Sequence, residues 1–166
     1  MDLLLDIAKD LANETDNIAF VIIGDGADKE RIAGRINDEK ITNVILLPFQ
    51  PYEDIAHVFS LGDIGLIISK PGVGNNSVPS KTWSIMAAGR PVLASFDSDS
   101  DLCRLIDKTG CGRHADAGNK EELTNIIKDM YKGDNEDFGE AGLKYLSTDL
   151  NKEKCVAQYV SAICER

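Results

Sequence analysis

The sequence lacks the long apolar run of a membrane protein and the basic amino terminus of an exported one. No apolar stretch approaches the roughly 18 residues that a membrane-spanning helix needs. The first ten residues, MDLLLDIAKD, contain acids where a signal peptide has bases. We therefore expect no transmembrane segment and no export signal in these residues. We expect a cytoplasmic protein, with membrane association of a full-length form left open.

Paired cysteines and an excess of positive charge are missing as well. The four cysteines form no C-x-x-C pair, so we expect free thiols rather than zinc ligands or disulfides. Eighteen Lys and Arg residues against 28 Asp and Glu residues give a net charge of −10. A surface of that sign argues against a nucleic-acid partner, and we attribute the charge to solubility.

The chain also offers no convincing pairing of a nucleophile with a base. Its two histidines are His57, in the middle of an amphipathic helix, and His114, in a short strand. A surface or core role is favoured over catalysis at both positions. We therefore assign no catalytic residue and no metal ligand.

What the chain does contain is an alternation of apolar runs and amphipathic segments over the length of one domain. Hydrophobic residues make up 43% and charged residues 28% of the 166, which fits a globular protein with one core. Helices are expected before, between and after strands at residues 18–24, 43–49, 64–69, 91–95 and 110–115. This order predicts an α/β fold with a Rossmann-like, doubly wound parallel sheet in three layers. The first expected element is a helix, whereas such a domain normally begins with a strand, so we expect a strand to be missing upstream.

A glycine-containing turn follows the first expected strand directly. Gly24, Asp25 and Gly26 precede a helix, and glycines at such a place let backbone N–H groups approach a phosphate. A dinucleotide fingerprint would need a third glycine where Lys29 stands, and the next strand does not end in an acid. An NAD site is therefore not favoured, and a tight strand-to-helix turn explains these residues equally well.

The most informative segment is the long polar loop after the third expected strand. Gly72 and Gly74 permit close approach of a ligand. The polar residues that follow are Asn75, Asn76, Ser77, Ser80 and Lys81. A helix expected from residue 79 would point free N–H groups and its positive dipole end at this loop, which suits a diphosphate. A P-loop is excluded because Ser80, not glycine, precedes Lys81; a long loop whose Ser77 caps a helix remains the alternative.

Two further loops carry weaker signals. Phe49 and Gln50 follow the second expected strand, where an aromatic ring and an amide could stack on a base and hydrogen-bond to it, unless Phe49 belongs to the core. The acid- and serine-rich residues 97–101 follow the fourth strand. We interpret them first as a helix cap and second as contacts to sugar hydroxyls.

Four segments of the chain together carry a family resemblance. They are VIIGDGADKERI (21–32), NVILLPFQPYEDIAHVFSLGDIGLI (43–67), VPSKTWSIMAAGRPVLAS (78–95) and TGCGRHADAGNKEELTNIIKDM (109–130). In order and spacing they resemble the carboxyl-terminal domain of the family 4, or group 1, glycosyltransferases over nearly the whole chain. The Pro-Ser-Lys variant at residues 79–81 resembles the branch that builds bacterial cell-surface polysaccharides, including fucosamine-type transferases.

The resemblance implies the GT-B architecture, in which two Rossmann-like domains face each other across a cleft. The carboxyl-terminal domain binds a nucleotide diphosphate sugar, and the amino-terminal domain binds the acceptor, a glycan or lipid-linked glycan. Transfer would retain the anomeric configuration and need no metal or other cofactor. The base would lie at Phe49 and Gln50, with Gly24, Asp25 and Gly26 near the diphosphate. The diphosphate and the donor sugar would meet Gly74, Asn75, Asn76, Ser77, Ser80 and Lys81.

The sequence departs from the family pattern at two places. The family has glutamates eight residues apart, and Asn76 and Ser84 stand at those positions here. Asn76 retains the means to contact sugar hydroxyls, whereas Ser84, at the place of the ribose-binding glutamate, makes a shorter and weaker contact. The family's first strand and its Arg/Lys pair, which neutralise the diphosphate, would lie upstream of Met1.

We therefore interpret residues 1–166 as a single nucleotide-sugar-binding domain. It would be a fragment of a glycosyltransferase whose acceptor domain and first strand lie upstream, and we expect no transferase activity from it alone. Two alternatives stay open: a standalone Rossmann-like ligand-binding module, and half of a GT-B sugar-nucleotide epimerase. The neutral Asn76 and Ser84 argue against the epimerase, which needs acids and a histidine in its cleft.

Overall fold

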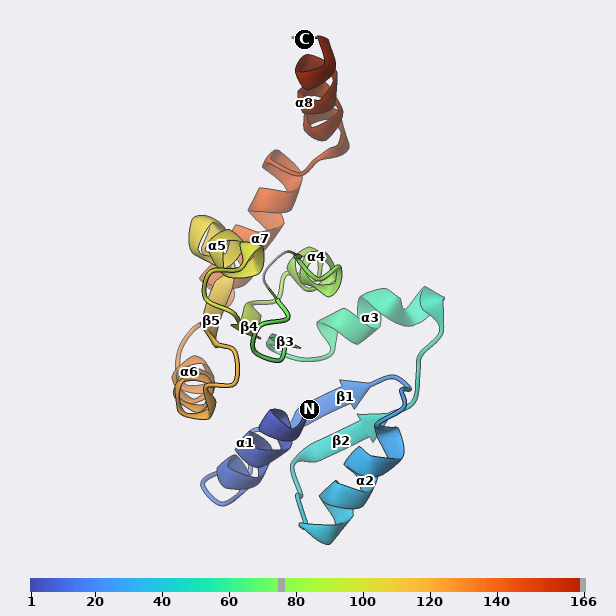
Figure 1. Ribbon diagram of the computed structural model, residues 1–166, viewed down its shortest axis with the longest axis vertical. Coiled ribbons are helices and arrows are strands. Elements are labelled where there is room, and N and C mark those ends of the chain that lie inside the picture. Colours follow the sequence, from blue (N-terminus) through green and yellow to red (C-terminus); the bar gives the residue numbers. More distant parts are fainter. Residues whose placement is uncertain (75–76, 165–166) are drawn as a thin grey trace.

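The computed structural model describes residues 1–74 and 77–164 and has the expected alternation of helices and strands (Figure 1). The elements are α1 (Asp2–Ala12), β1 (Phe20–Ile23), α2 (Lys29–Asp38), β2 (Val44–Leu47), the 3-10 helix η1 (Tyr52–Asp54), α3 (Ile55–Ser60), β3 (Gly65–Ile68), α4 (Lys81–Ala87), β4 (Val92–Phe96), α5 (Asp101–Thr109), β5 (Gly112–Asp116), α6 (Lys120–Lys132), α7 (Glu136–Thr148) and α8 (Lys152–Cys164). All five expected strands are present, each within a residue or two of its expected place. The α/β class is confirmed.

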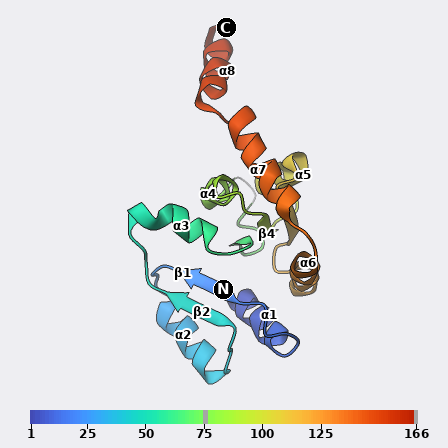
Figure 2. The same ribbon diagram turned by 180° about the vertical axis from the view of Figure 1, so that it is seen from behind.

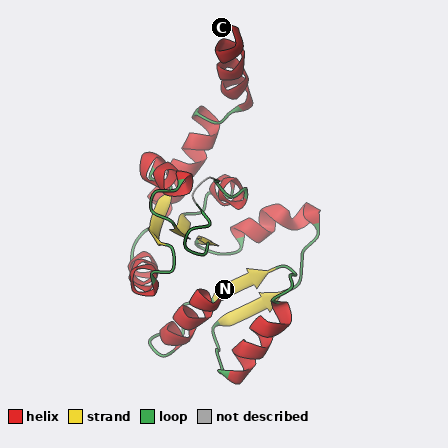
Figure 3. Cartoon of the chain, viewed as in Figure 1, coloured by secondary structure: helices red, strands yellow, loops and turns green. Residues whose placement is uncertain are grey.

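The five strands form two parallel sheets rather than one continuous sheet (Figure 3). β1 pairs with β2, with Phe20 opposite Val44. β3, β4 and β5 pair in that order, with Val92 of β4 opposite Gly65 and Gly112. Among the described residues, β1 and β3 thus each have a hydrogen-bonded neighbour on one side.

The three-stranded sheet is covered on both faces, as a three-layer fold requires. One face packs against α4, α5 and α7 through a cluster that includes Ile67, Met86 and Ile106. The other face packs against α1 and α6 through a cluster that includes Leu93 and Leu123. β4, the central strand of this sheet, is buried along its whole length.

The two-stranded sheet is covered on one face by α1 and α2 and is open on the other. Leu5 of α1 and Ile32 of α2 belong to the cluster under that covered face. Val21 and Ile45 face the opposite side and are 41% and 47% exposed. The continuous apolar runs predict strands buried on both faces, and for β1 and β2 that prediction is wrong, because no helix of the described chain covers the second face.

Helix α1 joins the two sheets. Its Leu5 and Ala8 pack toward α2 and the two-stranded sheet, whereas Ile7 and Leu11 pack with α6 and the three-stranded sheet. Residues three and four apart on a helix share a face, so the opening apolar pattern gives α1 two buried faces. α1 is therefore central to the domain although it lies at the chain's first residues.

The carboxyl-terminal helix α8 extends away from the rest of the chain (Figure 2). No residue of α8 is buried, and the side chains of Val156, Tyr159, Val160 and Ile163 are exposed. None of the helices described by the structure is long and apolar enough to cross a membrane.

Candidate functional site

The loops that follow the strands contact one another at the carboxyl ends of the two sheets. In parallel sheets this edge is where ligands bind most often. The Asp25 carboxylate, after β1, accepts a hydrogen bond from Lys29, and the backbone N–H of Phe49, after β2, lies near enough to act on it. Both interactions, the first more strongly, lower the pKa of Asp25. The first two of the expected nucleotide-binding loops are therefore neighbours.

The loop after β3 lies beside the loop after β1. The pKa of Asp28, at the amino end of α2, is lowered chiefly by its hydrogen bond and ion pair with Arg31, and further by the positive charge of Lys70. Lys70 begins the glycine-containing loop after β3. The loops after β1 and β3 therefore lie within electrostatic range of each other at the edge where the expected site lies.

Phe49 is exposed rather than part of the core. Its side chain is 73% accessible to solvent, and the core alternative for this residue is therefore wrong. Gln50 turns back on the chain, and its Nε2 donates to the Pro48 carbonyl at 2.8 Å. An accessible ring beside a fixed amide is a surface on which a planar base could stack.

Gly24 and Gly26 have open space around them. The backbone of Gly24 has a φ of +138°, which favours glycine, and its N–H donates to the Leu47 carbonyl at 3.1 Å. No atom lies within 4 Å of where a Cβ would sit on either glycine. The glycine at position 24 is therefore explained by a tight strand-to-helix turn. The open space around both glycines leaves room for a ligand.

Most of the polar residues from Ser77 to Ser84 are at least partly accessible to solvent. Ser77, Ser80 and Lys81 are exposed, whereas Ser84 is half-buried. α4 begins at Lys81 rather than near residue 79, and Ser80 occupies the capping position, so the alternative that Ser77 caps this helix is wrong. One side of α4 is buried through Thr82, Ile85 and Met86. Asn75 and Asn76 lie outside the described residues.

The acidic segment 97–101 divides into two roles. Ser100 caps α5, because its side chain accepts a hydrogen bond from the Cys103 N–H at 3.2 Å. Asp97 instead binds the loop after β3: its Oδ1 accepts from the Gly72 N–H at 2.9 Å and its Oδ2 from the Gly74 N–H at 3.0 Å. The expected helix cap is thus confirmed at Ser100, and the contact of Asp97 was not expected.

Two more carboxylates hold the neighbouring loops, and the sequence alone did not reveal them. Asp116, at the end of β5, accepts from the N–H and the hydroxyl of Ser98 at 3.2 and 2.9 Å. These hydrogen bonds, the hydroxyl first, lower the pKa of Asp116. Glu122 of α6 in turn accepts from the Asp116 N–H at 2.9 Å. Asp116 binds a residue 18 positions away in sequence, so local patterns carry no signal for that contact, whereas Glu122 binds a residue six positions away.

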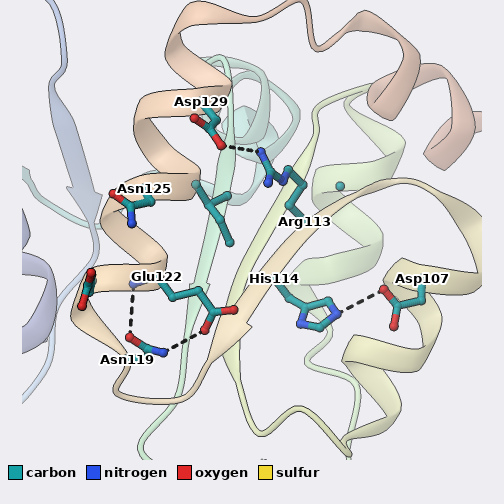
Figure 4. Close-up of a pocket in the computed structure, with 10 residues that line it drawn as sticks. Asp107, Arg113, His114, Asn119, Glu122, Asn125 and Asp129 are labelled. Carbon is teal, nitrogen blue, oxygen red and sulfur yellow. Dashed lines mark hydrogen bonds and ion pairs between the residues drawn. The ribbon is translucent and has the colours of Figure 1, made fainter.

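A cavity of about 630 Å³ lies elsewhere, between α5, β5 and α6 (Figure 4). Four of its side chains interact in two pairs: His114 Nε2 lies 3.1 Å from Asp107 Oδ1, and Arg113 lies 3.4 Å from Asp129. None of the residues expected to bind nucleotide lines this cavity. Within the described parts of the chain, no group of three or more His, Cys, Asp or Glu residues is gathered so as to hold a metal ion.

The sequence matches known glycosyltransferases over part of their length. A probable glycosyltransferase, WbjE of Pseudomonas aeruginosa, is 25% identical over 126 residues, which are 76% of this chain and 32% of WbjE. A putative colanic acid biosynthesis glycosyl transferase, WcaI of Escherichia coli, is 26% identical over 90 residues, 54% of this chain and 22% of WcaI. The chain therefore spans a third or less of the curated relatives it matches.

Solved structures share the fold. Staphylococcus aureus TarM, in a complex that contains UDP, superposes with a TM-score of 0.78 at 20% identity, covering 96% of this chain and 32% of TarM. Anabaena HepE in complex with UDP superposes with a TM-score of 0.80 at 17% identity, covering all of this chain and 45% of HepE. The family model for glycosyl transferases group 1 matches residues 1–145. That match covers most of the chain, and the chain belongs to the group 1 glycosyl transferase family.

Proposed function

We propose that this chain is the donor-binding domain of a glycosyltransferase that transfers a sugar from a nucleotide diphosphate sugar to a glycan or lipid-linked glycan in cell-surface polysaccharide synthesis. The observation that carries this proposal is the family match over residues 1–145. The names of WbjE and WcaI support a transferase, and that of WcaI supports an extracellular polysaccharide product. The UDP complexes of TarM and HepE support a nucleotide donor. A cytoplasmic location remains part of this proposal.

The proposed donor site runs along the carboxyl ends of β1, β2 and β3. Phe49 and Gln50 would take the base, and the open turn at Gly24 and Gly26 would leave room for the diphosphate. Lys81 supplies an exposed cation beside Ser80. A cation placed where charge develops on a leaving diphosphate stabilises the transition state. These residues bind and orient the donor, and we assign none of them a proton-transfer role.

We further propose that the complete enzyme supplies a β-strand between β1 and β3, and an acceptor domain. Phe20 and Gly24 donate their N–H groups toward β2, and Gly65 and Ser69 donate theirs toward β4. Because alternate residues of a strand point their N–H groups to opposite sides, those of Val21 and Leu66 point away from these partners. A parallel strand inserted there would join the two sheets. The proposal accordingly includes that the 166 residues alone have no transferase activity.

An NMR titration of the 166-residue chain with UDP and with GDP tests the donor site. We expect shifts of backbone amides around Phe49, Lys81 and Ser84 with one of the two nucleotides. Lys81→Ala should weaken that binding about tenfold, since a charge-assisted contact to phosphate is lost. Lys132→Ala makes the same change of charge at the end of α6 and serves as the control.

Two results would count against the proposed site. One is the absence of shifts with either nucleotide at millimolar concentration. The other is a set of shifts confined to the cavity between α5, β5 and α6, which would place binding elsewhere. Transferase turnover by the 166 residues alone would overturn the proposed need for further chain.

A further inference from the structure

We infer that Asp97 is a positioning residue for the proposed donor site: its carboxylate fixes the segment Lys70–Gly74, which leads into the residues expected to meet the diphosphate. The inference rests on the proposed function and adds a residue to it that no motif assigns. Asp97 acts through the backbone of this segment rather than by touching the nucleotide.

The contact between Asp97 and the loop is made by both carboxylate oxygens. Oδ1 accepts from the Gly72 N–H at 2.9 Å and Oδ2 from the Gly74 N–H at 3.0 Å. Hydrogen bonds from backbone N–H groups to an ionised acceptor are about twice as strong as those between neutral groups. Two such bonds from residues two apart fix both the position and the direction of the loop backbone.

The two glycines allow this approach of backbone to carboxylate. Gly72 has a φ of +77°, which side chains other than glycine's rarely tolerate. A Cβ on Gly74 would sit 2.5 Å from the ring of Phe96 and 3.3 Å from Asp97 Oδ2. Gly74 is itself buried. Gly72 therefore serves the backbone conformation of the loop, and Gly74 serves its close packing against the end of β4.

Asp97 is held by a rigid support. It follows Phe96, the last residue of the fully buried strand β4. The next residue, Ser98, is bound by Asp116, and Asp116 is bound through its N–H by Glu122 of α6. On the other side, a Cβ on Gly118 would lie 3.1 Å from the ring of Pro71. The segment Lys70–Gly74 is thus held from the end of β4 and lies close to the loop after β5.

The negative charge of Asp97 argues that it does not bind the nucleotide directly. A carboxylate beside a diphosphate repels it, so a direct role would weaken binding. A carboxylate that accepts hydrogen bonds from two loop amides instead fixes the segment Lys70–Gly74. Ordering the loop in advance removes part of the entropy cost of binding, and loss of Asp97 should therefore weaken nucleotide binding.

The test compares Asp97→Asn with Asp63→Asn in the full 166-residue chain. Asp63 is an exposed carboxylate at the amino end of β3, and its substitution makes the same change of charge. The asparagine amide group has one oxygen, so Asp97→Asn leaves one loop N–H facing another donor. We expect at least tenfold faster hydrogen exchange at Gly72 and Gly74 in Asp97→Asn, and upfield shifts of their amide protons. Asp63→Asn should show neither effect.

The dissociation constant for UDP or GDP, whichever binds the unaltered chain, provides the second readout. We expect it to rise about fivefold in Asp97→Asn, with the thermal midpoint within a few degrees of the unaltered chain, and to stay constant in Asp63→Asn. Tighter binding by Asp97→Asn would overturn the inference, since the carboxylate would then compete with the diphosphate for the loop amides. Unchanged affinity, or unchanged exchange at both glycines, would overturn it as well.

Failure of the proposed function gives a different pattern. In that case neither nucleotide shifts any amide of the unaltered chain, while hydrogen exchange at Gly72 and Gly74 still reports whether Asp97 holds the segment. If Asp97 holds the loop but the chain binds neither nucleotide, the proposed donor site is refuted, whereas the contact between Asp97 and the loop stands.

Discussion

Two hydroxyl groups lie in the core with no hydrogen-bond partner among the described residues. They belong to Thr82 of α4 and Ser95 of β4, and both residues are fully buried. Burying a hydroxyl without a partner costs about 1–3 kcal/mol in proteins. Neither position can be recognised from the sequence, because small polar residues in a helix or strand usually face solvent.

Replacing the Thr82 hydroxyl by a methyl group should stabilise the domain. Valine has the shape of threonine, so Thr82→Val keeps the packing and removes the unsatisfied group, and we expect a gain of about 1 kcal/mol. Urea unfolding followed by far-UV circular dichroism measures it. Thr124→Val is the matched control, because Thr124 Oγ1 donates to the Lys120 carbonyl at 2.7 Å and loses that bond. A loss of stability in Thr82→Val equal to that in the control would contradict this account.

At the scale of elements, α1 and α2 are connected by charged side chains at one edge of the domain. Glu39, after α2, accepts from Arg35 at 2.6 Å and from Lys9 of α1 at 2.9 Å. The hydrogen bond from Arg35, followed by that from Lys9, lowers the pKa of Glu39 from 4.5 to about 2. A carboxylate whose pKa is lowered in the folded state stabilises it above the unfolded pKa and loses that contribution as the pH falls.

The stability of the domain should therefore decrease between about pH 4.5 and pH 2, in part through Glu39. Glu39→Gln removes the titrating group, so we expect a flatter dependence of the unfolding midpoint on pH over this window. Chemical unfolding at half-unit pH intervals measures the slope. Glu140→Gln, at an exposed position of α7, should leave the slope as it is. Identical slopes in the two variants would show that Glu39 takes no part.

Sequence patterns predicted the elements well and their contacts less well. The strands and helices could be predicted from apolar runs and amphipathic spacing, because these patterns extend over only a few neighbouring residues. The exposure of Phe49 was one of two alternatives that the sequence left open, because burial depends on the whole fold. The contact of Asp97 was not expected, because its two partners lie 23 and 25 residues away. The loops of the candidate site could be named in advance, but the groups that hold them could not.

At the scale of the whole molecule, α1 is the element that couples the unfolding of one sheet to the unfolding of the other. Leu5 is fully buried in the cluster with α2, whereas Trp83, the only tryptophan, packs at the cluster of the three-stranded sheet. Fluorescence of Trp83 therefore reports the three-stranded sheet, and circular dichroism reports both sheets. A difference between the two signals during unfolding therefore reports the two-stranded sheet.

Leu5→Ala should separate the unfolding of the two sheets. Truncation of a fully buried leucine costs about 2–5 kcal/mol, and here the loss falls on the cluster between α1, α2 and the two-stranded sheet. In urea we expect the circular dichroism transition to begin before the Trp83 transition. Met86→Ala, in the cluster beside Trp83, should instead move the fluorescence transition. Coincident transitions in Leu5→Ala would mean that the domain unfolds as one unit.

The uncovered side of the two-stranded sheet has a consequence for how the molecule behaves in solution. Val21 and Ile45 form an apolar surface next to strands whose outer backbone groups have no described partner. Flat, apolar strand edges are templates on which identical chains pair. We expect the 166 residues to associate as their concentration rises. Val21→Lys should keep them monomeric in analytical ultracentrifugation.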